Sequence, residues 1–297
     1  MTNGFGKARK LMDISNQTIA VIGLGLIGGS ICKTIKKHTG KSCLALDTNP
    51  QTLQSALDDG VISAGMTPDD LKNCDIVIVA LHPKQTIRFI LDHVALFKPG
   101  SIVMDVCGIK SAVVEQVTMP LKEHGVHFVG THPMAGREFS GYEYALDNLF
   151  DRASMILTPT EQTSAEAVKE VASLAEIMHF KKVVISSPER HDQIIAFTSQ
   201  LAHVVSNAYI KSPSSQYYDG FSAGSFLDLT RVAKLNENMW TDLFMMNKDP
   251  LLFEIDTIID HICEYRDALR RNDDDALRQL LKDGRELKEK SLEMLNQ

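Results

Sequence analysis

The feature that most constrains the fold of this chain is a glycine-rich turn near its N terminus. The motif GLGLIG, residues 23–28, follows an apolar run at residues 19–22 and precedes a stretch with helical periodicity. A GxGxxG pattern between a strand and a helix is typical of a dinucleotide-binding turn. Its first glycine permits the tight turn, its second lets the backbone approach a pyrophosphate, and its third lets helix and strand pack closely. The motif therefore predicts a doubly wound α/β domain that binds a dinucleotide.

An acidic residue after the second predicted strand indicates which dinucleotide binds. Asp47 lies 24 residues after Gly23, where a carboxylate can accept hydrogen bonds from the adenosine ribose. Such a carboxylate repels a 2′-phosphate, and Thr48 and Asn49 offer no arginine to accommodate one. The N terminus of the helix that follows the glycine turn supplies N–H groups for the phosphates. We predict NAD as the cofactor, bound by Gly23, Gly25, Leu26, Ile27, Gly28 and Asp47.

The chain of 297 residues is long enough for two domains. Up to residue 187, short β-rich runs alternate with amphipathic helical stretches, which is the pattern of a parallel α/β sheet. Helical periodicity dominates after it, interrupted at residues 211–228 by a segment that we interpret as a functional loop or paired short helices. We predict a dinucleotide-binding domain at 1–187 and an all-helical domain at 188–297. The predicted strands are residues 18–22, 42–46, 75–80, 101–105, 127–130, 154–158 and 182–186.

Composition excludes several classes of partner. The formal net charge of −7 disfavours nucleic acid and anionic membranes, because binding to either depends on clustered Lys and Arg. The five cysteines are odd in number and lack CxxC spacing, which argues against a disulfide framework and against a structural metal site. Residues 1–13 lack an apolar core, and no run reaches the roughly 18 apolar residues of a membrane span. We expect a cytoplasmic protein.

One histidine stands where catalysis is expected. His132 directly follows the predicted strand 127–130, and ligands of such sheets bind beyond the carboxyl ends of the strands. A neutral imidazole can take the proton of a hydroxyl group while hydride leaves the carbon that bears it. An isolated histidine is more often structural, but this position favours a catalytic base. The same rule predicts that residues 81–83 and 106–108 line the cleft.

Several segments extend the pattern that begins with the glycine turn. They are GLGLIGGS (23–30), DVCGIK (105–110), HPMAGREFSG (132–141), His191-Asp192, SQLAH (199–203) and DLTR (228–231) with Trp240. This set resembles the prephenate and arogenate dehydrogenases of tyrosine biosynthesis, in matching order between residue 18 and about residue 265. GxGxxG is shared by many dehydrogenases, whereas HPMAGREFSG followed by the later histidine and arginine segments is specific to this family.

The resemblance implies a reaction and roles for individual residues. The reaction is the NAD-dependent oxidative decarboxylation of prephenate to 4-hydroxyphenylpyruvate, or of arogenate to L-tyrosine, by a homodimer whose helical domains associate. His132 would accept the proton of the ring C4 hydroxyl, and Arg231 would bind a substrate carboxylate. Glu138 would lie at the mouth of the site, and Ser199 and His203 would line the substrate pocket. The implied fold is a Rossmann-type domain followed by an all-helical dimerisation domain.

Helical spacing separates two histidines of the second domain. His191 precedes His203 by twelve residues, or about 18 Å at 1.5 Å per residue, so the two cannot both touch one small substrate. We assign His203 to the pocket, and His191, with Asp192, to a first-turn or interdomain role. The alternatives are that His203 is a core histidine and that Arg231 forms only a surface ion pair with Asp228. Core packing near the arginine is the role expected for Trp240.

The segment DVCGIK departs from the family pattern. The family commonly has a serine where Gly108 stands, and its hydroxyl is thought to assist at the substrate and at the catalytic histidine. A backbone N–H group, a water molecule or Cys107 remain as substitutes for it. Lys110 is interpreted either as a ligand of the cofactor phosphates or of a substrate carboxylate, or as a solvated surface lysine.

Two other functional classes remain open. β-Hydroxyacid dehydrogenases, imine reductases and 6-phosphogluconate-like enzymes share the plan of a Rossmann domain followed by helices. They normally rely on a lysine in the helical domain, whereas the helix from Glu189 presents histidines here. A regulatory protein that senses NAD without catalysis is the second alternative. From the length we expect no added mutase or regulatory module, and we expect any feedback by tyrosine to act at the active site.

Overall fold

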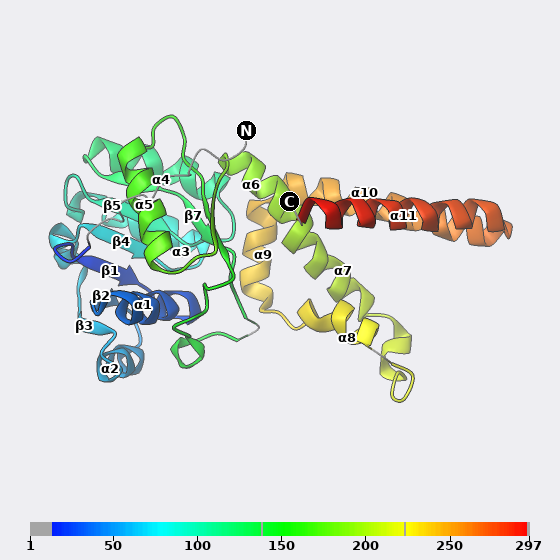
Figure 1. The fold of residues 1–297 in the computed structure, drawn as a ribbon, viewed down its shortest axis with the longest axis horizontal. Coiled ribbons are helices and arrows are strands. Elements are labelled where there is room, and N and C mark those ends of the chain that lie inside the picture. Colours follow the sequence, from blue (N-terminus) through cyan, green and yellow to red (C-terminus); the bar gives the residue numbers. More distant parts are fainter. Residues whose placement is uncertain (1–13, 138, 223, 296–297) are drawn as a thin grey trace. The chain divides into compact units, whose positions relative to one another are not determined.

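The computed structural model of the chain describes residues 14–137, 139–222 and 224–295 (Figure 1). They belong to two compact units that meet in sequence between residues 247 and 248. The first unit carries every strand of the described chain and the helices up to α9, and the second carries the helices α10 and α11. The division predicted at residue 187 stays a prediction.

A six-stranded parallel sheet forms the centre of the first unit. Its strands run in the order β3-β2-β1-β4-β5-β6. The order reverses at β1, which pairs with β2 on one side and with β4 on the other, so the loops after β1 and β4 flank the crevice in which such sheets bind ligands. The strands are β1 (Ile19–Ile22), β2 (Cys43–Leu46), β3 (Ile62–Gly65), β4 (Ile76–Val79), β5 (Ile102–Asp105) and β6 (His127–Val129).

Helices cover both faces of this sheet, and β1 shows how its residues are divided between them. Ile19 and Val21 belong to one apolar core, together with buried residues of α1 and α5. Ala20 and Ile22 belong to the other, together with residues of α3 and α4. The predicted doubly wound fold is therefore confirmed. The helices are α1 (Leu26–Thr39), α2 (Pro50–Asp58), α3 (Pro83–Asp92), α4 (Ser111–Glu123) and α5 (Ala165–Ile177), with short 3-10 turns η1 (Pro68–Asn73), η2 (Val94–Leu96) and η3 (Tyr142–Tyr144).

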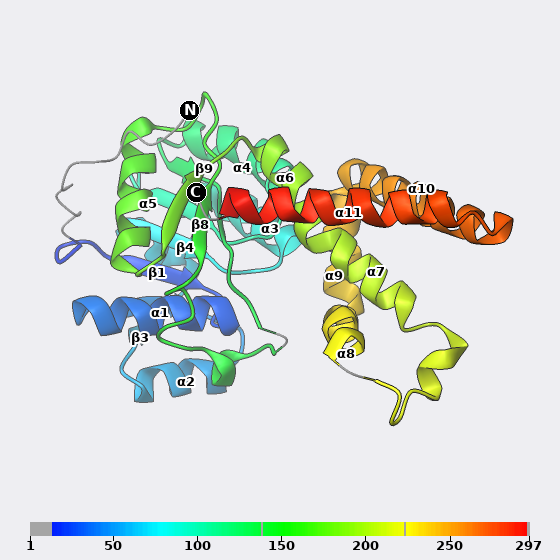
Figure 2. The same cartoon turned by 45° about the vertical axis from the view of Figure 1, so that its right-hand side comes forward.

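A second, three-stranded sheet was not expected from the sequence. It consists of β7 (Thr131–Pro133), β8 (Ser154–Leu157) and β9 (Lys182–Ile185), with β7 antiparallel and β9 parallel to β8. The prediction that all β-runs up to residue 187 join one parallel sheet is wrong, because the chain turns at Gly130 and continues as β7. Helix α5 packs against β9 (Figure 2). His132 thus lies in an edge strand, and its backbone is paired with Ile156 of β8.

Helices follow the second sheet to the end of the first unit, and the described residues after Ser187 contain no strand, as predicted. The first of these helices continues through a π-helical segment, η4, which is unusual and frequent at functional sites. Part of the interruption at 211–228 folds as the 3-10 turn η5 and the start of α8. The elements are α6 (Pro188–Ile195), η4 (Ala196–Leu201), α7 (Ala202–Tyr209), η5 (Pro213–Gln216), α8 (Gly224–Thr230), η6 (Arg231–Ala233) and α9 (Glu237–Met246).

The second unit is a pair of contacting helices, α10 (Lys248–Arg271) and α11 (Asp274–Leu295). The connection bends at Asn272, whose φ of 51° lies in the left-handed region that Asn tolerates. Large apolar side chains of both helices are exposed in the single chain, among them Phe253 and Leu287 at 68% and 65%. In the described part of the chain, no helix combines the length and the apolar character needed to cross a membrane.

Candidate active site

The glycine turn between β1 and α1 is closed toward the sheet and open on its outer side. Gly23 has a φ of 90°, and a Cβ there would lie 2.7 Å from the carbonyl oxygen of Ala80 at the end of β4. A Cβ on Gly28 would lie 1.9 Å from the carbonyl oxygen of Gly23. Among the described residues, no heavy atom lies within 4 Å of the position that a Cβ of Gly25 would take. The turn can therefore accept a phosphate group at Gly25 and tolerates only glycine at the other two positions.

Asp47 is tied to this turn from the end of β2. Its Oδ2 accepts a hydrogen bond of 2.7 Å from the backbone N–H of Leu24, and its Oδ1 accepts one of 2.8 Å from Asn49. The carboxylate is therefore held beside the turn, where an adenosine ribose would lie. Leu26 and Ile27 begin α1, so what they offer a phosphate is their backbone N–H groups, since the side chain of Leu26 is buried.

A chain of three hydrogen-bonded side chains starts at His132. Its Nδ1 lies 2.9 Å from Nε2 of His191, and Nδ1 of His191 lies 2.8 Å from Oδ1 of Asp192. His191 and Asp192 lie in the first turns of α6 and are 3% and 2% exposed. The expected place of His191 in the first turn of a helix is thus confirmed. Its ring contacts His132, the predicted catalytic histidine.

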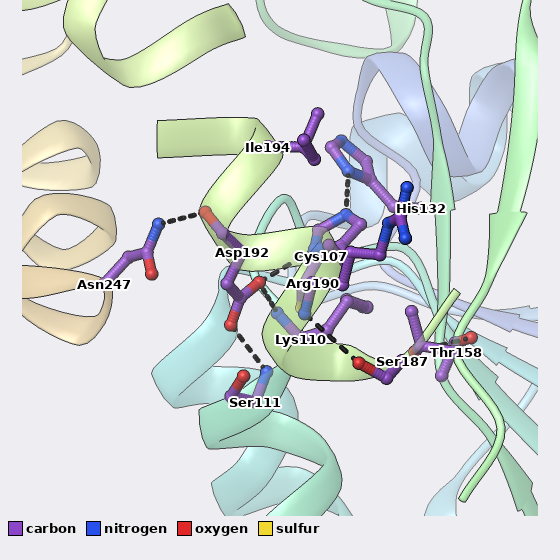
Figure 3. Close-up of polar contacts among 12 residues, drawn as sticks. Cys107, Lys110, Ser111, His132, Thr158, Ser187, Arg190, Asp192, Ile194 and Asn247 are labelled. Carbon is purple, nitrogen blue, oxygen red and sulfur yellow. Dashed lines mark hydrogen bonds and ion pairs between the residues drawn. The ribbon is translucent and has the colours of Figure 1, made fainter. Parts of the chain in front are cut away.

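The carboxylate of Asp192 is anchored at the N terminus of α4. The backbone N–H of Lys110 donates to Oδ1 at 2.7 Å, and that of Ser111 donates to Oδ2 at 2.8 Å. Asn247, after the end of α9, donates from Nδ2 to the backbone carbonyl of Asp192 at 2.9 Å and to Gln200 Oε1 at 2.7 Å. Figure 3 shows Asp192 between Ser111 and Asn247. These contacts join the start of α4, α6 and the end of α9 around Asp192.

A buried ion pair lies beneath the histidine. Lys110 is fully buried, and its Nζ donates to the carboxylate of Asp105 and, at 2.6 Å, to the carbonyl of Thr131. Asp105 also accepts backbone bonds from Cys107 at 2.9 Å and Thr131 at 3.1 Å. Lys110 is therefore not a solvated surface lysine, because it has no exposed surface. It is not positioned to bind a phosphate or a substrate carboxylate either, because its charge is already paired with Asp105. It fixes the strand end that carries His132.

Gly108 lies beside His132 and leaves room for a Cβ. A Cβ on Gly108 would lie 3.8 Å from Nε2 of His132, which is ordinary van der Waals distance. The thiol of Cys107 instead lies near Thr86 Oγ1, at 3.4 Å, and the carbonyl of Leu81. Burial, and the nearby Asp105 carboxylate, raise the pKa of this thiol well above its ordinary value. Cys107 therefore does not replace the serine that the family commonly has at position 108.

The surroundings of His132 keep its imidazole neutral. Burial lowers the pKa of His132 well below its ordinary value, and His191 and Lys110 lower it further. A neutral ring at physiological pH has a lone pair available to accept a proton, which is the state that a general base needs. Since Nδ1 is engaged by His191, the nitrogen that remains toward the space beside Gly108 is Nε2.

A second group of predicted residues gathers around α7. The ring of His203 stacks on that of Trp240 with a centroid distance of 3.7 Å, and its Nδ1 donates to the carbonyl of Ser199 at 2.8 Å. Burial lowers the pKa of His203, the bond to Ser199 opposes this, and the positive charge of Arg231 lowers it further. His203, Ser199 and Arg231 therefore lie near one another, and their role in a substrate pocket stays a prediction. Trp240, in α9, is half-buried and packs its ring on His203 and Phe244, which agrees with the expected packing role although its burial is only partial.

Comparison with known proteins supplies the family. A model of the prephenate dehydrogenase nucleotide-binding domain matches residues 31–186, and one of the prephenate dehydrogenase dimerization domain matches residues 187–283. The chain belongs to the prephenate dehydrogenase family. Prephenate dehydrogenase of Bacillus subtilis is 34% identical to it over 90% of this chain and 74% of that protein. The predicted family, enzyme class and nucleotide-binding domain are thereby confirmed.

Two solved structures of the family are close in fold. Prephenate dehydrogenase of Aquifex aeolicus, in complex with hydroxyphenyl propionate and NAD+, has a TM-score of 0.84 and 28% identity, and the match covers 95% of this chain and 100% of that one. Arogenate dehydrogenase of Synechocystis has a TM-score of 0.78 and 26% identity, with 92% of this chain and 99% of that one covered. The fold class of a Rossmann-type domain with a helical C-terminal part is confirmed for this family member.

Part of the site was not predicted from the sequence. The contact between His132 and His191, and the buried Asn247 and Gln200 behind Asp192, were not predicted. The adjacent His191-Asp192 pair was the one available signal, since a carboxylate beside a histidine often orients its ring. Glu138, predicted at the mouth of the site, lies outside the described residues.

Proposed function

We propose that this family member catalyses the NAD-dependent oxidative decarboxylation of prephenate to 4-hydroxyphenylpyruvate, a step of tyrosine biosynthesis. The observation that carries the proposal is His132, whose ring is held on β7 by His191 with Nε2 toward the space beside Gly108. The neutrality of this ring, which follows from its lowered pKa, suits a base that receives a hydroxyl proton. Gly23, Gly25, Leu26, Ile27, Gly28 and Asp47 would hold the dinucleotide.

The open space at Gly25 and the anchored carboxylate of Asp47 fit a dinucleotide. When NAD is bound, its nicotinamide ring supplies the hydride acceptor for the C4–H bond of the ring carbinol. His132 takes the proton of the hydroxyl group on the same carbon. The ring carboxylate then leaves as carbon dioxide, and the pair of electrons from the broken C–C bond completes the aromatic ring. The phenolate formed takes the proton back from His132, so the base ends the cycle in its starting state.

The chain must also bind a substrate with two carboxylates. Arg231 offers a guanidinium that can bind one of them through two hydrogen bonds, and it lies close enough to His203 to affect its pKa. His203 donates from Nδ1 to the Ser199 carbonyl, which leaves Nε2 for the ligand. These three residues would line the proposed substrate pocket, and the place of Glu138 at its mouth stays a prediction. General-base catalysis by His132 then contributes about 10²–10⁴-fold to the rate.

L-Arogenate is the second candidate substrate, favoured by the likeness to the Synechocystis arogenate dehydrogenase. The two substrates differ only in the side chain, which is a keto acid in prephenate and an amino acid in arogenate. The pocket around His203 and Arg231 would contact this side chain. We rank prephenate first because of the 34% identity to the Bacillus enzyme.

The proposal extends to the assembly and the setting of the enzyme. The match of residues 187–283 to a dimerization domain, together with exposed Phe253, Ile262 and Leu287 on α10 and α11, supports a homodimer. We also propose the functional division into a dinucleotide-binding domain, 1–187, and a substrate and dimerisation domain, 188–297. We also propose a cytoplasmic location, because NAD and the small-molecule substrate are expected there.

Initial rates with prephenate and with L-arogenate, each under NAD and under NADP, test the proposal in one experiment. We expect NADH to form with prephenate, and a much lower rate with NADP because Asp47 repels the 2′-phosphate. A faster rate with L-arogenate than with prephenate would make L-arogenate the preferred substrate. NAD binding without NADH formation from either ring carbinol would instead favour the regulatory alternative.

A further inference from the structure

The hydrogen bonds behind His132 determine which of its nitrogens carries a proton. They begin at Asp192, whose two carboxylate oxygens accept from the backbone N–H groups of Lys110 and Ser111 and from Nδ1 of His191. Burial alone raises the pKa of Asp192, but the bond from His191 and those from Ser111 and Lys110 hold it below its ordinary value. Asp192 is therefore ionised, and an ionised carboxylate can only accept hydrogen bonds.

The protonation of the two rings follows from this end of the chain. His191 must carry a proton on Nδ1, because Asp192 accepts from that atom at 2.8 Å. In the neutral ring, Nε2 of His191 is then an acceptor. His132 lies 2.9 Å away with its Nδ1, so that atom must donate. The lone pair of neutral His132 is thereby assigned to Nε2, the atom 3.8 Å from the Cβ position of Gly108.

We propose that His191 and Asp192 are positioning residues, which hold His132 in the tautomer with a free Nε2 and share the positive charge when that nitrogen takes a proton. The inference rests on the proposed role of His132 as the base. Neither residue needs to touch substrate, because both act through His132. Of the charged groups near this ring, Lys110 is already paired with Asp105. Among the described residues, the carboxylate of Asp192 is thus the one that can compensate the positive charge of protonated His132, through the ring of His191.

The rigidity of the carboxylate supports this role. Two backbone N–H groups at the start of α4 fix Asp192, and Asn247 holds the backbone carbonyl of the same residue. His191 has 3% of its surface exposed, so water does not compete for its nitrogens. A ring that served packing alone would not need a chain of three aligned bonds, which ends at a helix N terminus where a negative charge is stabilised.

The direct test is the tautomer of His132 in the protein without substrate. Long-range 15N–1H correlation spectra of 15N-histidine-labelled protein distinguish a protonated from an unprotonated ring nitrogen, and His132→Gln identifies the His132 signals by their loss. We expect Nδ1 protonated and Nε2 unprotonated. In His191→Phe, which removes the acceptor, the Nε2–H form should become populated. An Nε2–H form of His132 in the wild-type protein would overturn the inference, as would an unchanged tautomer in His191→Phe.

Kinetics provide the second readout. His191→Phe should lower kcat by about 10²-fold, within the range of general-base effects, while KM for NAD and prephenate changes little. His191→Gln keeps a carbonyl acceptor for Nδ1–H and should recover part of the loss in kcat, which a purely structural role would not predict. Glu189→Gln, at an exposed position of the same helix, is the matched control and should leave kcat unchanged. Equal kcat in the wild type and His191→Phe would contradict the proposal.

The two experiments separate this inference from the proposed function. The spectra need neither substrate nor turnover. They therefore report on the histidine relay, which is the hydrogen-bonded chain of His132, His191 and Asp192, even if prephenate is not the substrate. A His132→Gln protein with full activity, together with the expected tautomer, would remove His132 as the base and leave its positioning by His191 intact. If His191→Phe fails to fold, the wild-type spectrum and His191→Gln still decide the outcome.

Discussion

The glycine turn and the histidine relay both place polar groups beside the crevice, and they do so by different means. The turn depends on residues 23–28 and on Asp47, which contacts it through the N–H of Leu24. The relay brings together His132 from β7, His191 and Asp192 from α6, and the start of α4. His132 and His191 are 59 residues apart in the sequence. Local backbone geometry therefore builds the cofactor site, whereas long-range packing builds the catalytic one.

This difference predicts that changes in the two regions separate binding from turnover. The largest effect is expected at the base itself. His132→Asn should lower kcat by about 10²–10⁴-fold, because the general base is lost, and should leave the Kd for NAD within a few-fold of the wild type. The absorbance of NADH under steady-state conditions measures kcat, and isothermal titration calorimetry measures the Kd for NAD. Unchanged turnover would remove His132 from the proposed role.

The next effect is expected in the glycine turn. Gly28→Ala places a Cβ 1.9 Å from the Gly23 carbonyl oxygen, so the turn must shift. We expect a loss of about 1–3 kcal/mol in the free energy of unfolding, the usual range for overpacking, and weaker NAD binding. Gly25→Ala is the matched control, because its Cβ meets no described atom and should weaken NAD binding without lowering stability. Equal stability of both variants in urea unfolding would contradict this account.

The dependence on pH sharpens the comparison further. Because the pKa of His132 is lowered well below 6.5 in the folded protein, kcat should stay constant from pH 8 down to about 6.5 and fall only at lower pH. The unfolded chain binds the proton first as pH falls, so the stability that neutral His132 contributes is present above about pH 6.5 and decreases below it. NAD affinity, which does not involve this ring, should lack the same transition. A decrease of kcat already near pH 7 would contradict the lowered pKa.

The smallest effect on stability and turnover is expected at Gly108, where the family commonly has a serine. Gly108→Ser introduces a Cβ at ordinary distance, 3.8 Å, from His132 Nε2, so it should change the free energy of unfolding by only about 0.5 kcal/mol. Its hydroxyl can reach the base, and we expect kcat to change by less than about tenfold. Thermal unfolding and steady-state rates measure both. A large loss of stability would show that position 108 has no room for a side chain.

Sequence patterns predicted the parts of the molecule that depend on neighbours in the chain. The glycine turn lies between β1 and α1, as the motif requires, and helices alone follow Ser187 in the described residues. Two strands were missed. β3 has one buried residue, Ile62, and therefore lacks an apolar run, and β7 has three residues and ends in Pro133. Such short strands exist because a neighbouring strand pairs with them, which no local pattern records.

By itself, the sequence determined the doubly wound fold, the cofactor turn with Asp47, and the family to which His132 and Arg231 point. These features rest on short motifs, in which steric and hydrogen-bonding rules act locally, and on the order of these motifs along the chain. Only the tertiary structure decided that Lys110 is buried against Asp105, that Cys107 faces away from the site, and that His191 contacts His132. Burial and ring contacts depend on which elements pack together, and that is a property of the whole fold rather than of any one segment.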